Sequence, residues 1–184
     1  CVFVILGLLC GTCEPLQGQE NGKTNTHNQP KRYAIAIHGG AGSSAKDFDD
    51  ESVKRRRASM KKALAQGVAI LDKGGSSLDA VEAVIRILED DPQFNAGKGA
   101  VFNAVGSHEL DASIMDGRNK ACGAVAGVSH IKNPITLARL VMTETKHVLL
   151  AGEGAETFAK QFDVDWVEPS HFDTPHARKS WERY

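Results

Sequence analysis

Apolar residues recur along the first part of the chain with two spacings, and each spacing predicts a different element. Small and β-branched residues alternate between Tyr33 and His38, which predicts a strand that runs directly into the glycine-rich segment 39–44. Beyond it, apolar residues lie mostly three or four positions apart, as on one face of a helix. They are Val53, Met60, Leu64, Val68 and Leu71 in a first helix, and Leu78, Val81, Ile85 and Leu88 in a second.

Glycine and serine mark the boundary between these two helices. Gly74 and Gly75 end the first helix, since glycine is the residue most often found just past a helix C-terminus. Ser76 or Ser77 then caps the second helix, and Asp79 is placed to reach back toward a Ser76 cap. We therefore expect two consecutive amphipathic helices after the first strand.

The apolar period changes to 2 after Pro92, which predicts strands. Short turns join three extended segments into an expected antiparallel meander: Ala100–Asn103, Glu109–Met115 and Ala121–His130. Helical spacing returns with Asn133 as the expected cap and Pro134 in the first turn, followed by a strand at 147–151 and a helix at 153–162. This order predicts an α+β fold with helices packed outside sheets.

The first nine residues form an apolar run, which is too short for a bilayer span of roughly 20 residues. Such a run fits the apolar part of a secretory leader. We expect an N-terminally clipped leader at 1–18, a flexible polar tether at 19–32, and a periplasmic or secreted protein. A buried strand formed by the run, and a cytoplasmic location, are the alternatives.

Charge and cysteine content narrow the function classes. The 184 residues include 22 Lys and Arg against 23 acidic residues, so no basic excess is available to bind nucleic acid. We interpret the basic run Lys54–Arg57 as a solvated helix face. Only Cys122 lies in the body of the domain, so no disulfide framework is expected, and the Cys10–Cys13 pair lacks the context of a redox or metal motif.

Five motifs, in this order, resemble the plant-type L-asparaginase and isoaspartyl peptidase family. They are HGGAG at 38–42, GGSSLDAVE at 74–82, FNAG at 94–97, LDASIMDG at 110–117 and NPITLARLV at 133–141. The resemblance implies an N-terminal-nucleophile hydrolase fold, an αββα sandwich of which this chain holds only the α-subunit half. It implies an α-subunit domain at 33–165 and, at 166–184, a linker before an autocleavage site.

The chemistry that the resemblance implies is hydrolysis of L-asparagine, of isoaspartyl dipeptides, or of both. The nucleophile would be a threonine freed by self-cleavage, and its own amine would accept the hydroxyl proton. That threonine would begin a β subunit that follows this sequence, so this chain alone is expected to be inactive. The expected partners are this β subunit and a second αβ unit. The alternatives are an inert scaffold remnant and a glycosylasparaginase-type amidase. A serine hydrolase is disfavoured because no Gly-x-Ser-x-Gly elbow occurs.

The resemblance also implies supporting residues in this chain. Asn95, Gly39 and Gly40 would lie near the nucleophile, although Asn95 could instead satisfy the backbone of its own loop. No organic cofactor is expected. A structural sodium ion would be bound by backbone carbonyls, with a solvated acidic helix end at 89–91 as the alternative. The carbonyls are those of Leu88, Glu89, Asp91, Phe94, Ala96 and Lys98.

Overall fold

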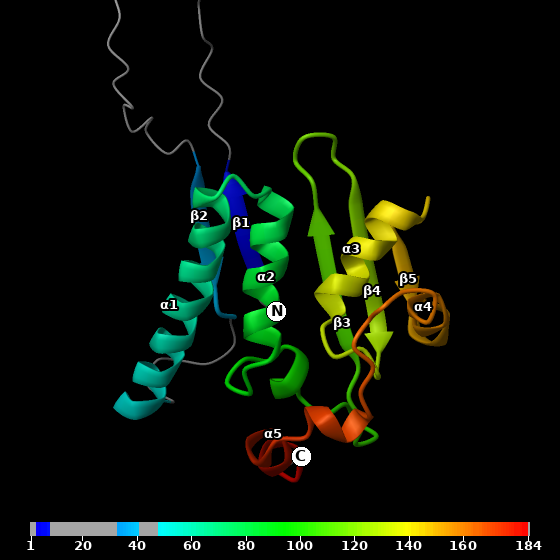
Figure 1. Ribbon diagram of the computed structural model, residues 1–184. Helices are drawn as coiled ribbons and strands as arrows, with labels where there is room; N and C mark the ends of the chain where they lie inside the picture. The colour runs from blue at the N-terminus through cyan, green and yellow to red at the C-terminus, as the bar shows by residue number, and fades with distance from the viewer. Residues whose placement is uncertain (1–2, 8–32, 41–47, 184) are drawn as a thin grey trace, which may run out of the picture.

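The fold comprises a layer of helices packed on two small sheets, in a computed structural model that describes residues 3–7, 33–40 and 48–183 (Figure 1). The strands are β1 (Phe3–Gly7), β2 (Ala34–His38), β3 (Leu110–Met115), β4 (Cys122–Val128) and β5 (Leu149–Ala151). The helices are α1 (Asp50–Asp72), α2 (Ser77–Glu89), α3 (Pro134–Glu144), α4 (Gly152–Ala159) and α5 (Pro175–Trp181), with short 3-10 turns η2 (Gly97–Gly99) and η3 (Pro169–Phe172). The mixed α/β class expected from the sequence is confirmed.

One small sheet pairs β1 with β2 in antiparallel fashion, with Phe3 opposite His38 and Gly7 opposite Ala34. Residues 3–7 of the N-terminal apolar run thus form a strand, and the choice between a leader and a buried strand stays open. The predicted leader and tether boundaries stay predictions, since residues 8–32 lie outside the described part of the chain. None of the described helices is both long and apolar enough to cross a membrane.

The second sheet has the order β3-β4-β5, antiparallel between β3 and β4 and parallel between β4 and β5. The strands predicted at 109–115 and 121–130 are confirmed as β3 and β4. The strand predicted at Ala100–Asn103 is wrong, because Asn103 forms a turn instead. Its side-chain oxygen accepts the backbone N–H groups of Val105 at 3.1 Å and Ser107 at 2.9 Å. An asparagine that bonds the backbone ahead of it favours a turn over a strand ladder.

The boundary between α1 and α2 follows the predicted signals. Gly74 has φ +83°, a left-handed conformation that a side chain would strain. Ser76 caps α2 by accepting the Asp79 N–H at 3.1 Å, while the Asp79 carboxylate accepts the Ser76 N–H at 3.2 Å. This reciprocal box ties the first turn of α2 to the end of the connection.

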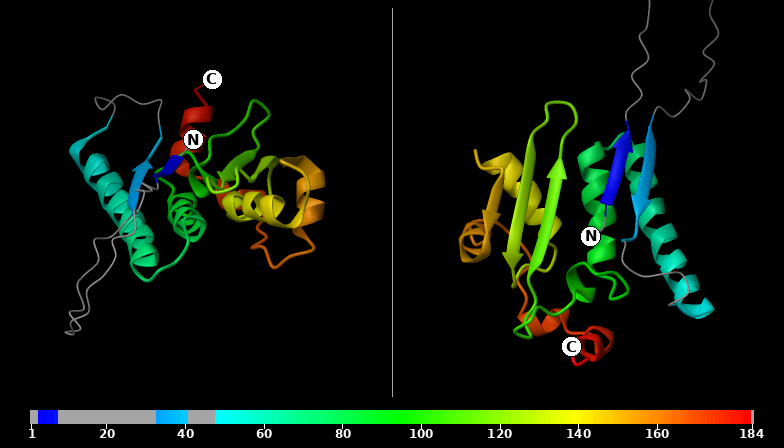
Figure 2. Two further views of the ribbon diagram at one scale, coloured as in Figure 1. Left: turned by 90° about the horizontal axis from the view of Figure 1, so that it is seen from above. Right: turned by 180° about the vertical axis from the view of Figure 1, so that it is seen from behind.

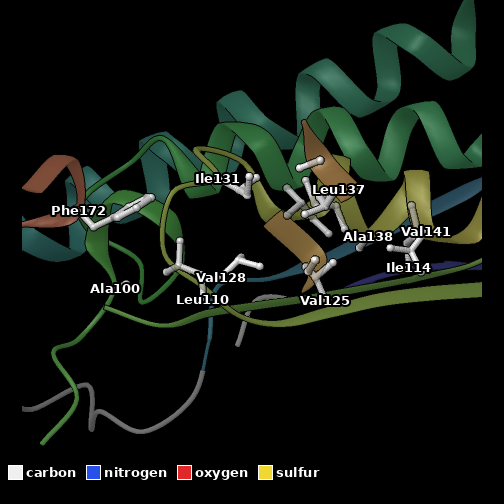
Figure 3. Packing of buried hydrophobic residues seen from close by; sticks show 14 residues of the cluster. Ala100, Leu110, Ile114, Val125, Val128, Ile131, Leu137, Ala138, Val141 and Phe172 are labelled. Atoms are coloured by element: carbon white, nitrogen blue, oxygen red, sulfur yellow. The ribbon is translucent and has the colours of Figure 1, made fainter. Parts of the chain in front are cut away.

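The main core lies between α3 and one face of β3 and β4 (Figure 3). Val125 and Ile114 of the strands lie near Leu137, Ala138 and Val141 of α3, whereas Leu110 lies with Val128 toward Phe172 at the other end of the cluster. The other face of the sheet carries Ser113 and Met115, which are exposed. Seen from behind, β3 and β4 lie in front of α3, and no described helix covers them (Figure 2).

Gly123 of β4 lets the backbone of α3 approach the sheet. A Cβ atom there would strike the Ala138 carbonyl oxygen and come within 2.5 Å of the Met142 nitrogen. Because these are backbone atoms, they cannot move aside as a flexible side chain would. We expect Gly123→Ala to lower the free energy of unfolding by about 2 kcal/mol, measured by chemical denaturation.

Gly154→Ala is the matched control for this substitution. Gly154 lies on α4 with nothing within 4 Å of its added Cβ. Alanine in a helix is favoured over glycine, so this variant should be as stable as the parent or more stable by up to about 1 kcal/mol. A Gly123→Ala protein as stable as Gly154→Ala would contradict the close contact between α3 and β4.

Candidate functional site

A compact loop at 90–100 follows α2 and holds most of the predicted site. Backbone hydrogen bonds fold it through successive turns: Asp91 N–H to Leu88 O, Phe94 N–H to Asp91 O, Ala96 N–H to Phe94 O and Gly99 N–H to Ala96 O, at 2.8–3.3 Å. Each of these carbonyls accepts one N–H. Since a carbonyl oxygen has two lone pairs, each retains one with which it can contact a cation.

Two glycines of the η2 turn make room for backbone carbonyls at the start of the loop. Gly97 has φ +52°, and a Cβ on it would collide with the carbonyl oxygen of Glu89. A Cβ on Gly99 would collide with the carbonyl oxygen of Phe94 and lie 2.7 Å from that of Pro92. Backbone oxygens of Glu89, Pro92 and Phe94 therefore lie close to the glycine turn, and oxygen is the ligand atom that hard cations prefer.

No group of three His, Cys, Asp or Glu side chains in the described ranges is arranged to hold a metal. A cation at the loop would therefore be held by main-chain oxygens, which suit hard ions such as sodium. Glu89 and Phe94, both predicted ligands, are among the carbonyls that face η2, whereas Pro92 was not predicted. The full ligand set stays a prediction.

The side chain of Glu89 is buried at the junction of α2 and α3, with only 3% of its surface exposed. Its Oε1 accepts the backbone N–H of Ile135 in the first turn of α3, at 3.1 Å. The expected side-chain cap by Asn133 is wrong: Asn133 stands at the N-cap position but makes no capping hydrogen bond, and its Nδ2 donates to Asp90 at 3.3 Å. The Glu89 carboxyl group of the preceding helix replaces the local cap.

Burial raises the pKa of Glu89 to about 8, and the nearby Asp90 carboxylate adds to this, while the Ile135 N–H opposes it. The alternative of a solvated acidic helix end is therefore wrong for Glu89. Its place at the C-terminus of α2 is unfavourable for a negative charge, whereas the N-terminus of α3 favours one. The carboxyl group thus links the ends of two helices beside the loop.

Asn95 follows the buried Phe94 and is exposed. Its Oδ1 accepts the Val101 N–H at 3.0 Å, which is the loop-satisfying role considered as an alternative. Within the described part of the chain its NH2 group makes no hydrogen bond. The side chain can therefore be fixed through its oxygen and still donate a hydrogen bond away from the loop.

The end of β2 meets the same loop through the ring of Phe94. A Cβ on Gly39 would lie 3.1 Å from both Phe94 Cε1 and Met60 Sδ, so the glycine packs against both side chains. Gly40 has φ +108°, and its N–H donates to Nδ1 of His38 at 3.3 Å. The structure thus brings predicted residues of the two segments together. Gly42 and the rest of 41–47 lie outside the described residues.

Helix α1 also contacts this loop, which the sequence interpretation missed. Lys54, Arg55 and Arg57 are exposed, as expected of a solvated face, but Arg56 is only partly exposed and donates to the carbonyl oxygen of Gln93. The sequence spacing could have predicted this contact, because Arg56 lies three residues after Val53 and four before Met60. It therefore lies on the apolar face of the helix.

Four threonines of this chain make hydrogen bonds that stabilise the fold. Thr174 caps α5 by accepting the Ala177 N–H at 3.1 Å, and Thr136 donates to Glu82 at 2.7 Å. Thr143 and Thr145 donate to carbonyls four residues earlier in or at the end of α3. None of these four hydroxyls is presented as a reacting group.

Comparison with known proteins identifies the family. A sequence model of the asparaginase family (Asparaginase_2) matches residues 31–184. The isoaspartyl peptidase of Salmonella typhimurium is 47% identical over 145 residues, which are 78% of this chain and 46% of the relative. The isoaspartyl peptidase/L-asparaginase of Danio rerio is 43% identical over 149 residues (81% and 47%), and that of Xenopus laevis 46% over 147 (80% and 46%).

The chain therefore belongs to the asparaginase family, a family of hydrolases with the N-terminal-nucleophile fold. It spans about half the length of the curated relatives it matches. The family resemblance deduced from the five sequence motifs is thereby confirmed.

The buried carboxyl of Glu89 generates a stability prediction. Glu89→Gln should fold as well as the parent near pH 4, because a neutral amide resembles a carboxyl that is protonated in both the folded and the unfolded state. Glu89→Ala should lose about 2 kcal/mol, since the Ile135 N–H loses its acceptor. Urea denaturation of the three proteins at constant sodium concentration measures both differences. Equal stabilities of the Gln and Ala variants would contradict the helix-linking role.

The raised pKa also fixes how stability should change with pH. The folded-state pKa of about 8 exceeds the ordinary glutamate value of 4.5, so folding takes up a proton between these pH values. The contribution of Glu89 is complete below pH 4.5 and is lost as pH rises toward 8. The stability of the parent relative to Glu89→Gln should therefore fall over this window. A stability difference between the two proteins that does not change with pH would contradict the raised pKa of Glu89.

Proposed function

We propose that this chain is the α-subunit part of an autoprocessing threonine hydrolase that cleaves L-asparagine, isoaspartyl dipeptides, or both. The family match over residues 31–184 carries this proposal. The relatives' names support the substrate classes, since they are isoaspartyl peptidases or isoaspartyl peptidase/L-asparaginases. The matched length supports the subunit assignment, because about half of each relative remains for a β subunit.

The uncovered face of the β3-β4-β5 sheet supports the sandwich architecture. It carries Met115, 59% exposed, and Leu149, 53% exposed, with Ala124 between their strands. A sheet buried on one side and apolar on the other favours packing against a second sheet. We propose that β-subunit strands cover this face in an αββα sandwich, and that two αβ units associate.

The proposed reaction is acyl transfer to a threonine hydroxyl at the start of the β subunit. The hydroxyl oxygen attacks the side-chain amide carbon of the substrate, while the free α-amine accepts the hydroxyl proton. A terminal amine has a pKa of about 8, so near neutral pH a fraction of it is unprotonated and can accept this proton. The amine then returns the proton to the leaving nitrogen, and water hydrolyses the ester to release aspartate.

The residues of this chain would position the nucleophile. The Asn95 side chain is held through Oδ1 and can donate from its NH2 group to the threonine, while Gly39 keeps the segment after β2 close to Phe94. A sodium ion bound by the loop carbonyls would supply a fixed positive charge that holds the loop in one conformation. The loop of this chain thus positions the nucleophile, and the β subunit supplies the reacting groups.

Self-cleavage of the complete protein tests the proposal. We expect the purified full-length product to separate into two fragments, the smaller of which begins with threonine by N-terminal sequencing. The pair of fragments should hydrolyse asparagine or an isoaspartyl dipeptide, whereas residues 1–184 expressed alone should release neither ammonia nor aspartate. An uncleaved, inactive full-length protein would favour the scaffold alternative. Specific hydrolysis of glycosylated asparagine would favour the amidase alternative.

Asn95→Ala should lower kcat of the processed enzyme by about 10²-fold, because one positioning donor is removed. Asn119→Ala is the matched control, since Asn119 Oδ1 likewise accepts a backbone N–H, that of Ala121 at 2.9 Å, in a turn beyond β3. Steady-state kinetics and thermal unfolding of both variants separate a role of Asn95 in positioning the nucleophile from its role in stabilising the loop backbone. If both variants lose the same stability and kcat of Asn95→Ala is unchanged, Asn95 only accepts a backbone hydrogen bond and does not position the nucleophile.

A further inference from the structure

The outer side of the 91–94 segment is held by side chains from α1. The hydroxyl of Ser59 donates to Oδ2 of Asp91. Gln93 Nε2 lies 3.2 Å from the Ser59 oxygen and 3.2 Å from both Asp91 carboxylate oxygens, and the Gln93 N–H donates to Asp91 at 3.0 Å. Ser59, Asp91 and Gln93 thus form a closed network between helix and loop.

Arg56 adds a second connection, one turn earlier on α1. Its Nη1 donates to the backbone oxygen of Gln93. Its guanidinium carbon lies 4.4 Å from the ring centroid of Phe48 and 5.9 Å from that of Phe94. A cation beside two aromatic faces is stabilised by the ring quadrupoles, which offsets part of its desolvation. The Nε of Arg56 is buried without a hydrogen bond in the described residues, so this placement has a cost that the rings and the Gln93 oxygen must offset.

These contacts reach the proposed cation ligands through the peptide planes of the loop. Fixing the Gln93 carbonyl also fixes the following N–H, that of Phe94, because the peptide unit is rigid. This N–H donates to the carbonyl oxygen of Asp91 at 3.2 Å, while Ser59 holds the Asp91 side chain. The orientation of one expected ligand carbonyl, that of Asp91, is thus tied to α1 through the Phe94 N–H that it accepts.

We propose that Arg56 and Ser59 are positioning residues that set the sodium affinity of the loop. This inference rests on the proposed cation site. Main-chain carbonyls carry no net charge, so their affinity for a hard cation depends on how many point inward before the ion binds. By holding Asp91 and Gln93 from outside, α1 keeps the inward carbonyls in place. The helix therefore acts on the site without touching the cation or the substrate.

The experiment measures sodium binding to the full-length protein through thermal unfolding. The unfolding temperature is recorded against sodium chloride concentration, with choline chloride holding ionic strength constant. A bound ion raises the unfolding temperature in proportion to the logarithm of its concentration over its Kd. We expect Arg56→Met and Ser59→Ala to need about tenfold more sodium than the parent for the same rise, as for other outer partners of metal ligands.

Three further variants separate positioning from general stability. Arg57→Met removes the neighbouring exposed arginine and should leave the sodium dependence unchanged. Ser59→Thr keeps the hydroxyl and should restore the affinity that Ser59→Ala loses. Arg56→Lys keeps the charge without the planar guanidinium and should give only partial restoration. If Arg56→Met fails to fold, the Ser59→Ala and Ser59→Thr pair carries the test.

The outcomes distinguish this inference from the cation site on which it rests. A parent protein whose unfolding temperature does not respond to sodium would overturn the cation site, and the positioning role with it. A responsive parent, with Arg56→Met and Ser59→Ala less stable but unchanged in their sodium midpoint, would overturn the positioning role alone. A tenfold shift in both variants, absent in Arg57→Met, would support it.

Discussion

The hydrogen bond from the Ile135 N–H to the Glu89 carboxyl is the contact around which the described structure is arranged. It joins the last residue of α2 to the first turn of α3 inside the protein, where neither group has water to replace its partner. Helix α2 packs on α1 and β2 on one side and contributes Ile85 to the core of the larger sheet on the other. The buried carboxyl strengthens this junction together with the contacts of Arg139 with Asp79 and Glu82, and the loop begins directly beside it.

The loop at 90–100 is held from both sides as a consequence. On the inner side, Gly97 lies against the carbonyl oxygen of Glu89, so the placement of the helix junction determines the path of the loop. On the outer side, Arg56 and Ser59 hold Gln93 and Asp91. A cation site made of backbone oxygens needs such support. If the loop were free to rotate its carbonyls, cation binding would cost the entropy of ordering them, and the affinity for the cation would fall. The buried ring of Phe94 extends the support to Gly39 at the end of β2.

Local sequence signals predicted the elements whose stabilising partners are nearby in the chain. The capping box of Ser76 and Asp79, the glycine at the end of α1 and the alternation in β3 each depend on a few adjacent residues. Signals failed where another interaction, local or long-range, competed with the one that the pattern suggested. Ala100–Asn103 has extended spacing, yet Asn103 bonds to Val105 and Ser107 and forms a turn. Asn133 is a good cap by type, yet the buried carboxyl of Glu89 reaches the first turn of α3 instead.

The sequence by itself determined the order of helices and strands, the family and the segments that form the candidate site, because these depend on periodicity and on contiguous motifs. Only the tertiary structure decided which of these residues meet. It placed Phe94 against Gly39, directed Glu89 into the protein and turned Arg56 from an apparent surface charge into a contact of the loop. The physical reason is that burial and hydrogen bonding between residues far apart in the chain depend on how helices pack. No spacing within a single segment encodes that packing.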